Sequence, residues 1–547
     1  MPVVTLNLKR LEKLVGGKTC KSKIIESLPF LGLDIEEEAK DYIRVEYSPN
    51  RPDYATDVGI ASGLQGLLGL KKGAEKLDIK KSAKSALIET NAATKKVRPH
   101  ICGIIAKGGR LDDETIKQLI ALQEDLHFGV GRRRKKASVG IHDLDKISLP
   151  LSYTVASRAH KFVPLAMNNE MSVEQILEKM DVGHDYGHLL KNQENVPIIL
   201  DAKKNTISFP PIINSALTTV SAKTKNLLVE VTGTDKNATE DTLAVVATTL
   251  HGLGSMLYDF KTDAKGSSQI FKTRSVTLDP VLVNQILGLK LAPSAICNHL
   301  KKCRLDAVPR GKKIICNIPR FRFDVFGPMD LVEEIALGYG IQNLTTSLPA
   351  STSVGQKNPV TKKLDQLSQI MTGLGFTETL NSSLTSKRVL YEATKRDSSG
   401  LIEVLESKSQ EHTILRDSIL PGLLENLSRN IHESYPQKLF ETGTVFSKGS
   451  PIKESISLAC LSAHKDTSFT EIKAALQSLL KTDSNIECST KASENPIFAQ
   501  GKTADVIVAG KKVGVIGEIN LQVIENFKIR VPVSGFEIIL SDFVLQG

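Results

Sequence analysis

An acidic cluster is the first feature of the sequence whose residue types and spacing could do chemistry. Asp330, Glu333 and Glu334 are spaced i, i+3 and i+4 after Pro328, which favours the first turn of a helix, so the three share one helix face. Asp324 precedes them in the chain. Four converging carboxylates repel one another unless a cation lies between them, and hard oxygen ligands suit Mg²⁺ or Ca²⁺. Acidic residues that complement a helix dipole are the alternative, and the spacing leaves both open.

A polar pattern around Glu230 is the second such feature. If this segment is a strand, alternate residues face one side, so Glu230, Thr232 and Thr234 could line a polar pocket. The segment that contains Pro211 and Asn214 precedes it in the chain and would form a neighbouring wall. The alternative is a half-exposed strand whose polar face is solvated. No residue here is an obvious hydrolytic nucleophile.

Five consecutive cations are the third feature. They favour contact with a phosphate backbone, electrostatically and without sequence selectivity. A solvated surface loop is the alternative, and the run itself does not choose between them. The five residues are Arg132, Arg133, Arg134, Lys135 and Lys136.

The cysteines and histidines give weaker signals. Seven cysteines with no CxxC pair favour buried thiols in a reducing cytosol over a zinc site, although two of them and a histidine lie within residues 297–303. His127 and His142 lie near acidic residues, but residues 141–147 also fit a strand that enters a turn. We therefore expect neither group to bind a metal.

Length and composition limit the number of domains and the class of protein. The 547 residues suggest about four domains, and the net charge of +10 favours an anionic partner such as nucleic acid. The 41% of hydrophobic residues excludes a disordered chain, a collagen-like repeat and a small disulfide-stapled scaffold. The longest apolar stretch, 243–258, is too short to span a bilayer and predicts a buried helix.

These features must be positioned by four modules, which polar stretches rich in Lys, Gly, Ser or Pro separate. Mixed helical and strand patterns predict an α+β multidomain chain, with a strand at 318–326 and a late pair of strands in 513–527. The motifs Arg51-Pro-Asp53 and Arg322-Phe-Asp324 each precede an apolar helical run, so the first and third modules share a fold unless this repeat is chance. The modules cover about residues 1–85, 90–265, 270–345 and 350–547.

The segment with the acidic cluster, PRFRFDVFGPMDLVEEIALGYG (319–340), resembles the metal-binding segment of the phenylalanyl-tRNA synthetase β-subunit family. Other segments resemble the same family in the same order and together cover essentially the whole chain. The chain length, IHDLDKI and VTGTD are similar to the archaeal and eukaryotic-cytosolic form. The other segments are EYSPNRPDYATDVGIASGLQG (46–66), ALQEDLHFGVGRRRKKASVGIHDLDKI (121–147), FPPIINSALTTVSAKTKNLLVEVTGTD (209–235) and ILRDSILPGLLENLSRN with KLFETGTVF (414–446).

The resemblance implies a subunit of an α2β2 phenylalanine–tRNA ligase in the cytoplasm, with no membrane segment. The α subunit would bind ATP and phenylalanine and charge tRNA(Phe). This chain would hydrolyse mischarged Tyr-tRNA, because a hydrophobic pocket cannot strongly reject an analogue that only adds a hydroxyl. In chain order, the implied modules are an N-terminal α/β module, an editing module, a metal-binding winged-helix-like module and a catalytically inactive class II synthetase-like antiparallel-sheet module.

By motif position, the resemblance assigns roles to the residues singled out above. It points to Glu230 and Thr232 for recognition of tyrosine. Because no nucleophile is evident, we expect bound water to be the attacking group, and the charge of the basic run predicts contact with tRNA. The rival hypotheses are a tRNA-binding scaffold without editing activity and a free-standing carboxylate-metal hydrolase. The expected Mg²⁺ ligands are Asp324, Asp330, Glu333 and Glu334, and the expected editing pocket contains Pro211, Asn214, Glu230, Thr232 and Thr234.

The last module lacks the residues of a working class II synthetase site. Such a site needs an arginine to clamp the ATP α-phosphate, but residues 438–446 contain none and residues 513–527 lack a terminal Gly-x-x-Arg. Arg416 and Arg429 occur nearby, in segments that look like helix or loop. We therefore expect a scaffold that packs on the α subunit.

Overall fold

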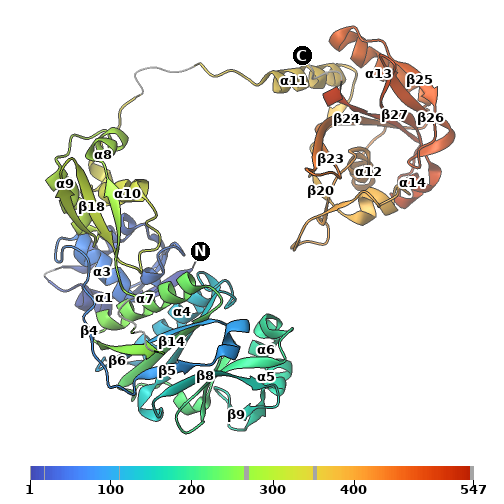
Figure 1. The fold of residues 1–547 in the computed structure, drawn as a ribbon. Helices are drawn as coiled ribbons and strands as arrows, with labels where there is room; N and C mark the ends of the chain where they lie inside the picture. The colour runs from blue at the N-terminus through green and yellow to red at the C-terminus, as the bar shows by residue number, and fades with distance from the viewer. Residues whose placement is uncertain are drawn as a thin grey trace. The chain divides into compact units, whose positions relative to one another are not determined.

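The computed structural model describes residues 2–17, 19–109, 111–263, 266, 270–348 and 354–542. The chain forms two compact units, Met1–Leu348 and Pro349–Gly547, which are described separately below (Figure 1). The architecture is mixed α+β with several sheets, as the sequence predicts. No helix in the described ranges is long and apolar enough to cross a membrane.

The first and third modules have the same order of elements: a strand, two helices, two strands and a helix. In each, the last strand lies in the middle of a three-stranded antiparallel sheet, β1-β3-β2 or β16-β18-β17. The common fold expected from the repeated Arg-x-Asp motif is confirmed. The elements are β1 (Val3–Asn7), α1 (Leu8–Val15), α2 (Lys21–Ser27), β2 (Asp34–Glu38), β3 (Tyr42–Glu46) and α3 (Asp57–Leu67), then β16 (Arg274–Leu278), α8 (Pro280–Leu287), α9 (Pro293–Lys302), β17 (Asp306–Arg310), β18 (Lys313–Ile318) and α10 (Pro328–Tyr339).

The middle module is built on one ten-stranded sheet, with the order β13-β12-β11-β8-β5-β15-β6-β14-β7 and β4 paired to β15. Val229 and Val231 pack into the core with α4 and α7, and Leu228 belongs to the core on the opposite face. This alternation puts Glu230 on the face away from α7. The strands are β4 (Ile79–Lys80), β5 (Leu87–Thr90), β6 (His100–Lys107), β7 (Ala137–Asp143), β8 (Leu151–Ser157), β11 (Asn195–Leu200), β12 (Thr206–Phe209), β13 (Ile213–Asn214), β14 (Asn226–Gly233) and β15 (Met256–Thr262). The helices are α4 (Asp113–Phe128), α5 (Val173–Lys179), α6 (Asp181–Tyr186) and α7 (Lys236–Gly252), and β9 (Lys161–Phe162) pairs with β10 (Met171–Ser172).

Two expectations about local structure in this unit are wrong. Of residues 318–326, only Ile318 is in a strand, because β18 ends there and Pro319 has no N–H to continue the ladder; residues 319–326 form turns and loop. The apolar stretch 243–258 is a helix only up to Gly252. The chain then turns through Gly254, whose φ of +87° suits glycine, and enters β15.

The second unit has a seven-stranded sheet, β19-β23-β24-β28-β27-β26-β25, which is antiparallel except for the short pair β19–β23. Helices α11 and α13 pack on one face, and α12 and α14 on the other. The late pair of strands expected in 513–527 is a strand and a helix, because Asn520 caps the start of α14. The elements are α11 (Pro359–Gly373), β19 (Thr377–Glu378), β20 (Leu384–Thr385), β21 (Ile402–Glu403), β22 (Ile414–Leu415), α12 (Leu420–Arg429), β23 (Gln437–Ser447), β24 (Lys453–Ala463), α13 (Phe469–Ser484), β25 (Ser489–Ala492), β26 (Phe498–Val508), β27 (Lys511–Ile519), α14 (Leu521–Asn526) and β28 (Val533–Ile539).

Candidate functional site

The middle module contains a cavity of about 680 Å³. Its walls come from α4, from β7 and β14, and from the chain around β13. Strands β7 and β13 are the two ends of the ten-stranded sheet, yet a Cβ atom at Gly140 of β7 would lie 3.2 Å from Oδ1 of Asn214 in β13. The sheet therefore curls until its two edges face each other, and the cavity lies at this junction.

Glu230 brings an unpaired carboxylate oxygen to this cavity. The residue is 3% exposed, and within the described part of the chain its Oε2 is buried without a hydrogen-bond partner. Its Oε1 lies 3.7 Å from Nε2 of His142, which is too far for a hydrogen bond. A buried, unpaired acceptor is costly to the fold, and Glu230 lines the cavity with this acceptor unused.

Two glycines flank Glu230 in the sheet, Gly103 of β6 and Gly140 of β7. A Cβ atom at Gly140 would lie 2.5 Å from Oε1 of Glu230 and 2.7 Å from Nε2 of His142. Any side chain at this position would collide with the carboxylate or cover it. The missing side chain therefore keeps Glu230 open to the cavity.

A buried arginine supports the sheet beside Glu230. Arg98 donates from Nε to Oγ1 of Thr232 at 2.9 Å, and from Nη2 to Oγ of Ser138 at 3.1 Å. Burial lowers the pKa of Arg98 to about 10, and the charges of Tyr153 and Glu230 oppose that decrease. The hydroxyl of Thr232 is thus occupied by Arg98 and Ser138.

Arg134 differs from the other four residues of the basic run because its side chain is buried. Its Nη1 donates to the carbonyl oxygens of Pro211 at 3.2 Å and Ile212 at 2.8 Å, and its Nη2 donates to Glu124 at 3.0 Å. The guanidinium group of Arg134 therefore connects the cavity wall that contains Pro211 to α4. The other four residues of the run, Arg132, Arg133, Lys135 and Lys136, are exposed.

The five residues expected to form one pocket are only partly brought together. Pro211, Asn214 and Glu230 line the cavity. Thr232 is buried in the sheet beside Glu230 and is not part of the lining. Thr234 lies beyond the end of β14, is exposed, and donates to the carbonyl oxygen of Lys135 at 2.9 Å.

The four carboxylates of the acidic cluster do not converge on one point. Arg322, which is 2% exposed, donates from Nη2 to Asp324 at 2.7 Å and to Glu334 at 2.5 Å. Burial alone would raise the pKa of Asp324, but Arg322 outweighs this effect and holds the pKa below its usual value. A guanidinium group is therefore the cation between two of these carboxylates.

The other two carboxylates have different surroundings. Asp330 accepts from the backbone N–H groups of Phe326 at 2.6 Å and Gly327 at 2.7 Å, so it caps α10. Glu333 is exposed. In the described ranges, no group of three or more His, Cys, Asp or Glu side chains is placed to hold a metal ion. As arranged here, the four residues do not fit a Mg²⁺ cage, and Mg²⁺ binding stays a prediction.

Sequence reasoning missed Gly140 and Arg98 in the cavity region and considered His142 only as a possible metal ligand. The available signal for Gly140 was a glycine inside a strand pattern, which is typical of a close approach. His142 lies two residues further along β7 and donates to or accepts from Thr218 at 2.8 Å. A lone arginine before a strand gives no comparable signal.

In the second unit, Arg416 is held in a buried ion pair. Its Nη1 donates to Glu441 at 2.5 Å and its Nε donates to the carbonyl oxygen of Thr444 at 3.0 Å. Arg429 is exposed at the end of α12 and pairs with Glu425 at 3.1 Å. Arg416 is therefore committed to the protein and is not free to clamp a phosphate.

Comparisons with known proteins cover nearly all of the chain. Residues 114–249 match the B3/4 domain, residues 276–341 match the tRNA synthetase B5 domain, and residues 344–540 match the phenylalanyl tRNA synthetase beta chain CLM domain. A solved N-terminal fragment of the phenylalanyl-tRNA synthetase β-subunit from Pyrococcus horikoshii is similar in fold, with a TM-score of 0.58 and 29% identity. The similarity covers 62% of this chain and 99% of that fragment.

Full-length relatives give the same result. The phenylalanine–tRNA ligase beta subunit of Archaeoglobus fulgidus is 37% identical, and the alignment covers 100% of both chains. That of Methanocaldococcus jannaschii is 38% identical over 98% of this chain and 100% of the relative. Together with the motifs and the fold, these matches show that the chain belongs to the phenylalanine–tRNA ligase β-subunit family, which makes it a subunit of an aminoacyl-tRNA synthetase.

Proposed function

We propose that this chain pairs with an α subunit in an α2β2 phenylalanine–tRNA ligase and removes tyrosine attached in error to tRNA(Phe). The observation that carries the editing proposal is the unpaired, buried Oε2 of Glu230 beside a cavity of about 680 Å³. A tyrosine hydroxyl would donate a hydrogen bond to this oxygen. A phenylalanine ring offers no donor, so its binding would leave the carboxylate buried and unpaired.

The cavity supports hydrolysis by water rather than by a protein nucleophile. Of the serines that line it, Ser138 is hydrogen-bonded to Arg98, and Ser208 donates to Asn214 at 3.0 Å. Ser215 is directed at the carbonyl oxygen of Val163 at 3.3 Å. A nucleophilic serine needs an adjacent general base, and none of these contacts supplies one. A water molecule positioned by the backbone and by the tRNA's own hydroxyl would be the attacking group.

The exposed part of the basic run is proposed to contact tRNA. Arg132, Arg133 and Lys135 are exposed on a turn next to the cavity wall that Arg134 anchors. Exposed cations in this position would hold the phosphate backbone while the acceptor end enters the cavity. Arg134 itself is proposed to position the wall and not to bind tRNA.

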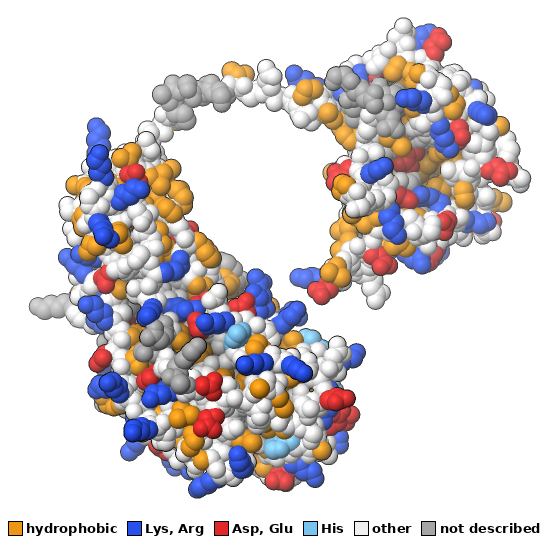
Figure 2. Space-filling model, viewed as in Figure 1, with side chains coloured by type: hydrophobic (Ala, Val, Ile, Leu, Met, Phe, Trp, Pro, Cys, Tyr) orange, Lys and Arg blue, Asp and Glu red, His pale blue; other side chains and the backbone are white. Residues whose placement is uncertain are grey.

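The second unit is proposed to contact the α subunit. Hydrophobic side chains are visible on its surface in Figure 2, and Leu380, Leu405 and Leu521 are 90%, 90% and 69% exposed. Exposed large apolar side chains are typical of interaction sites when they gather in a patch. With Arg416 committed to Glu441, this unit would act as a scaffold, and charging would belong to the α subunit. All seven cysteines are free thiols, which supports a cytoplasmic location.

A tRNA-binding scaffold with an inactive pocket is the rival, and hydrolysis assays on the complex separate the two. The chain would be copurified with its α subunit and tested for phenylalanine charging and for release of tyrosine from Tyr-tRNA(Phe). Gly140→Ala should abolish release and leave charging intact, because the new methyl group would meet Glu230. Gly373→Ala is the matched control, because nothing lies within 4 Å of its Cβ position. Unchanged release by Gly140→Ala, or no release by the unmodified complex, would contradict the editing proposal.

A further inference from the structure

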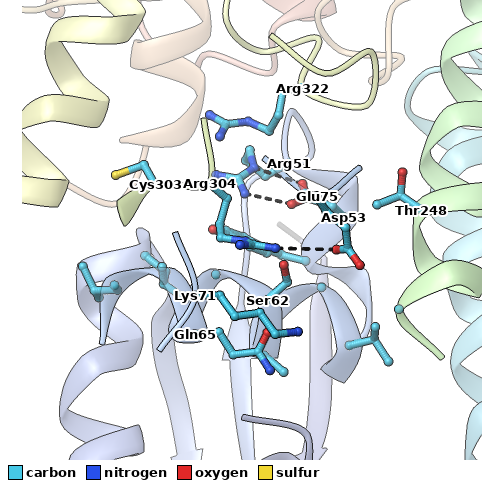
Figure 3. Close-up of a pocket in the computed structure, with 18 of the residues that line it drawn as sticks. Arg51, Asp53, Ser62, Gln65, Lys71, Glu75, Thr248, Cys303, Arg304 and Arg322 are labelled. Carbon is cyan, nitrogen blue, oxygen red and sulfur yellow. Dashed lines mark hydrogen bonds and ion pairs between the residues drawn. The ribbon is translucent and has the colours of Figure 1, made fainter. Parts of the chain in front are cut away.

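A second cavity, of about 270 Å³, lies where the first, middle and third modules meet (Figure 3). Its lining includes α3 with the segments on either side of it, the end of α7, the turn between α9 and β17, and α10 with the loop before it. It shares no lining residue with the cavity around Glu230. The proposed editing function makes no use of it.

The lining of this second cavity carries more positive than negative charge. Five lysine and arginine side chains face three carboxylates. Figure 3 shows Arg322, Arg51 and Arg304 close together, and its dashed lines mark the Arg304–Glu75 and Arg51–Asp53 pairs. The cations are Arg51, Lys71, Lys302, Arg304 and Arg322, and the carboxylates are Asp53, Glu75 and Glu334.

Arg304 is a largely buried cation of this lining whose donors are not all satisfied. Its Nε is buried and has no hydrogen-bond partner within the described ranges, and its Nη2 lies 3.9 Å from Glu75, beyond hydrogen-bond distance. Only 13% of the side chain is exposed. Its backbone has a φ of +61°, a left-handed conformation that costs a non-glycine residue roughly 1–2 kcal/mol. Strain and unsatisfied donors at one position point to a ligand.

Two further cations have donors to spare. Arg51 uses Nε and Nη2 on Asp53, at 2.9 and 2.8 Å, and stacks 3.9 Å above the ring of Tyr54. A guanidinium has five N–H groups, so Arg51 can still donate to a third partner. Lys71 is exposed at the rim and forms no ion pair with another described residue.

We propose that this cavity binds a small phosphorylated compound, whose phosphate group accepts hydrogen bonds from Arg51, Arg304 and Lys71. A phosphate fits better than a carboxylate, because a carboxylate occupies one guanidinium fork, whereas these donors come from three separate segments of the cavity lining. The apolar walls, which include Phe321 and Leu337, would cover the part of the ligand that carries the phosphate. The small volume favours a free metabolite over a nucleic-acid backbone.

The test is phosphate binding to the full chain in complex with its α subunit. Ribose 5-phosphate would be titrated by calorimetry into the unmodified complex and into complexes with Arg304→Gln or Lys71→Gln. A phosphate site at the α subunit would bind equally in all three. The proposal expects a further saturable site that Arg304→Gln weakens by about tenfold or more, since a hydrogen bond from a charged group is lost. Lys71→Gln, at an exposed residue that cannot disturb the core, should weaken it several-fold.

Matched controls make each outcome decisive. Arg158→Gln removes a partly exposed arginine paired with Glu174 outside this cavity and should leave binding unchanged. Succinate tests a dicarboxylate at the same ionic strength. The proposal is overturned if no such site appears, if neither variant at Arg304 or Lys71 weakens it, or if succinate binds in place of the phosphate. It is also overturned if tRNA displaces ribose 5-phosphate from this site, since the occupant would then be a nucleic-acid phosphate.

Discussion

Replacing Glu230 tests the editing proposal directly, because within the described residues its Oε2 has no hydrogen-bond partner and its Oε1 lies 3.7 Å from Nε2 of His142, too far for a hydrogen bond. A hydrogen bond to a charged group contributes roughly 1.5–3 kcal/mol. At about 1.4 kcal/mol for each factor of ten, Glu230→Ala should lower kcat/KM for hydrolysis of Tyr-tRNA(Phe) by about 10- to 150-fold. Glu230→Gln keeps a neutral acceptor, so its kcat/KM should lie between that of Glu230→Ala and that of the unmodified complex.

The assay would follow release of labelled tyrosine from Tyr-tRNA(Phe) by the complex with the α subunit. Charging with phenylalanine serves as the control and should be unchanged, because the cavity around Glu230 has no part in the proposed charging reaction. The thermal unfolding midpoint should stay the same or rise. An unsatisfied buried acceptor costs about 1–3 kcal/mol, so its removal should relieve the fold.

Two results would refute this reasoning about Glu230. If Glu230→Ala hydrolyses Tyr-tRNA(Phe) at the unmodified rate, the carboxylate does not recognise the tyrosine hydroxyl. If Glu230→Gln lowers the unfolding midpoint by many degrees, the carboxylate has a structural partner, and the burial of an unpaired oxygen is the wrong basis for the proposal.

Three further predictions concern the residues around the two cavities. Arg134→Lys keeps the charge but loses the hydrogen bond to Pro211, so it should slow Tyr-tRNA hydrolysis by about tenfold. Its affinity for tRNA in filter-binding assays should be unchanged. Lys135→Ala should lower the affinity for tRNA and leave the rate of hydrolysis unchanged. Arg322→Leu should cost about 3–5 kcal/mol in denaturant unfolding, because it leaves buried carboxylates without their cation; recovery with added Mg²⁺ would show that these carboxylates can bind the metal. The hydrogen bond to Glu75 raises the pKa of His251, so the stability it adds is complete below about pH 6.5 and declines as pH rises through the folded-state pKa. Unfolding midpoints across this range should therefore fall less with rising pH in His251→Asn than in the unmodified chain.

The local part of the candidate site was predictable from the sequence. Alternation along a strand places Glu230 opposite Val229 and Val231, and it is independent of the rest of the fold. The contribution of β7 was not predictable, because Gly140 approaches Asn214 only when the two edges of a ten-stranded sheet meet. That closure depends on pairing between segments far apart in the chain.

The basic run shows a second limit of sequence reasoning. Five adjacent cations look equivalent in composition, and their shared charge predicts one shared role. The backbone separates them, because Arg132, Arg133 and Arg134 all have positive φ values, between 48° and 62°. This left-handed turn directs Arg134 into the protein, where its side chain donates hydrogen bonds to carbonyl oxygens at the cavity wall. Only tertiary contacts could identify the residue that is buried.

The Arg-x-Asp repeat offers an explanation of Asp324 that competes with metal binding. Arg51 donates from Nε and Nη2 to Asp53 at 2.9 and 2.8 Å. Arg322 donates from the same two atoms to Asp324 at 2.9 and 2.7 Å. Asp53 forms this pair although the helix that follows it, α3, has Asp57 as its one acidic residue and no counterpart of Glu333 and Glu334. The pair is therefore a property of the shared fold, and Asp324 needs no metal to account for its presence. If Mg²⁺ binds the third module, the residues that distinguish it from the first, above all Glu333, are where binding should be sought.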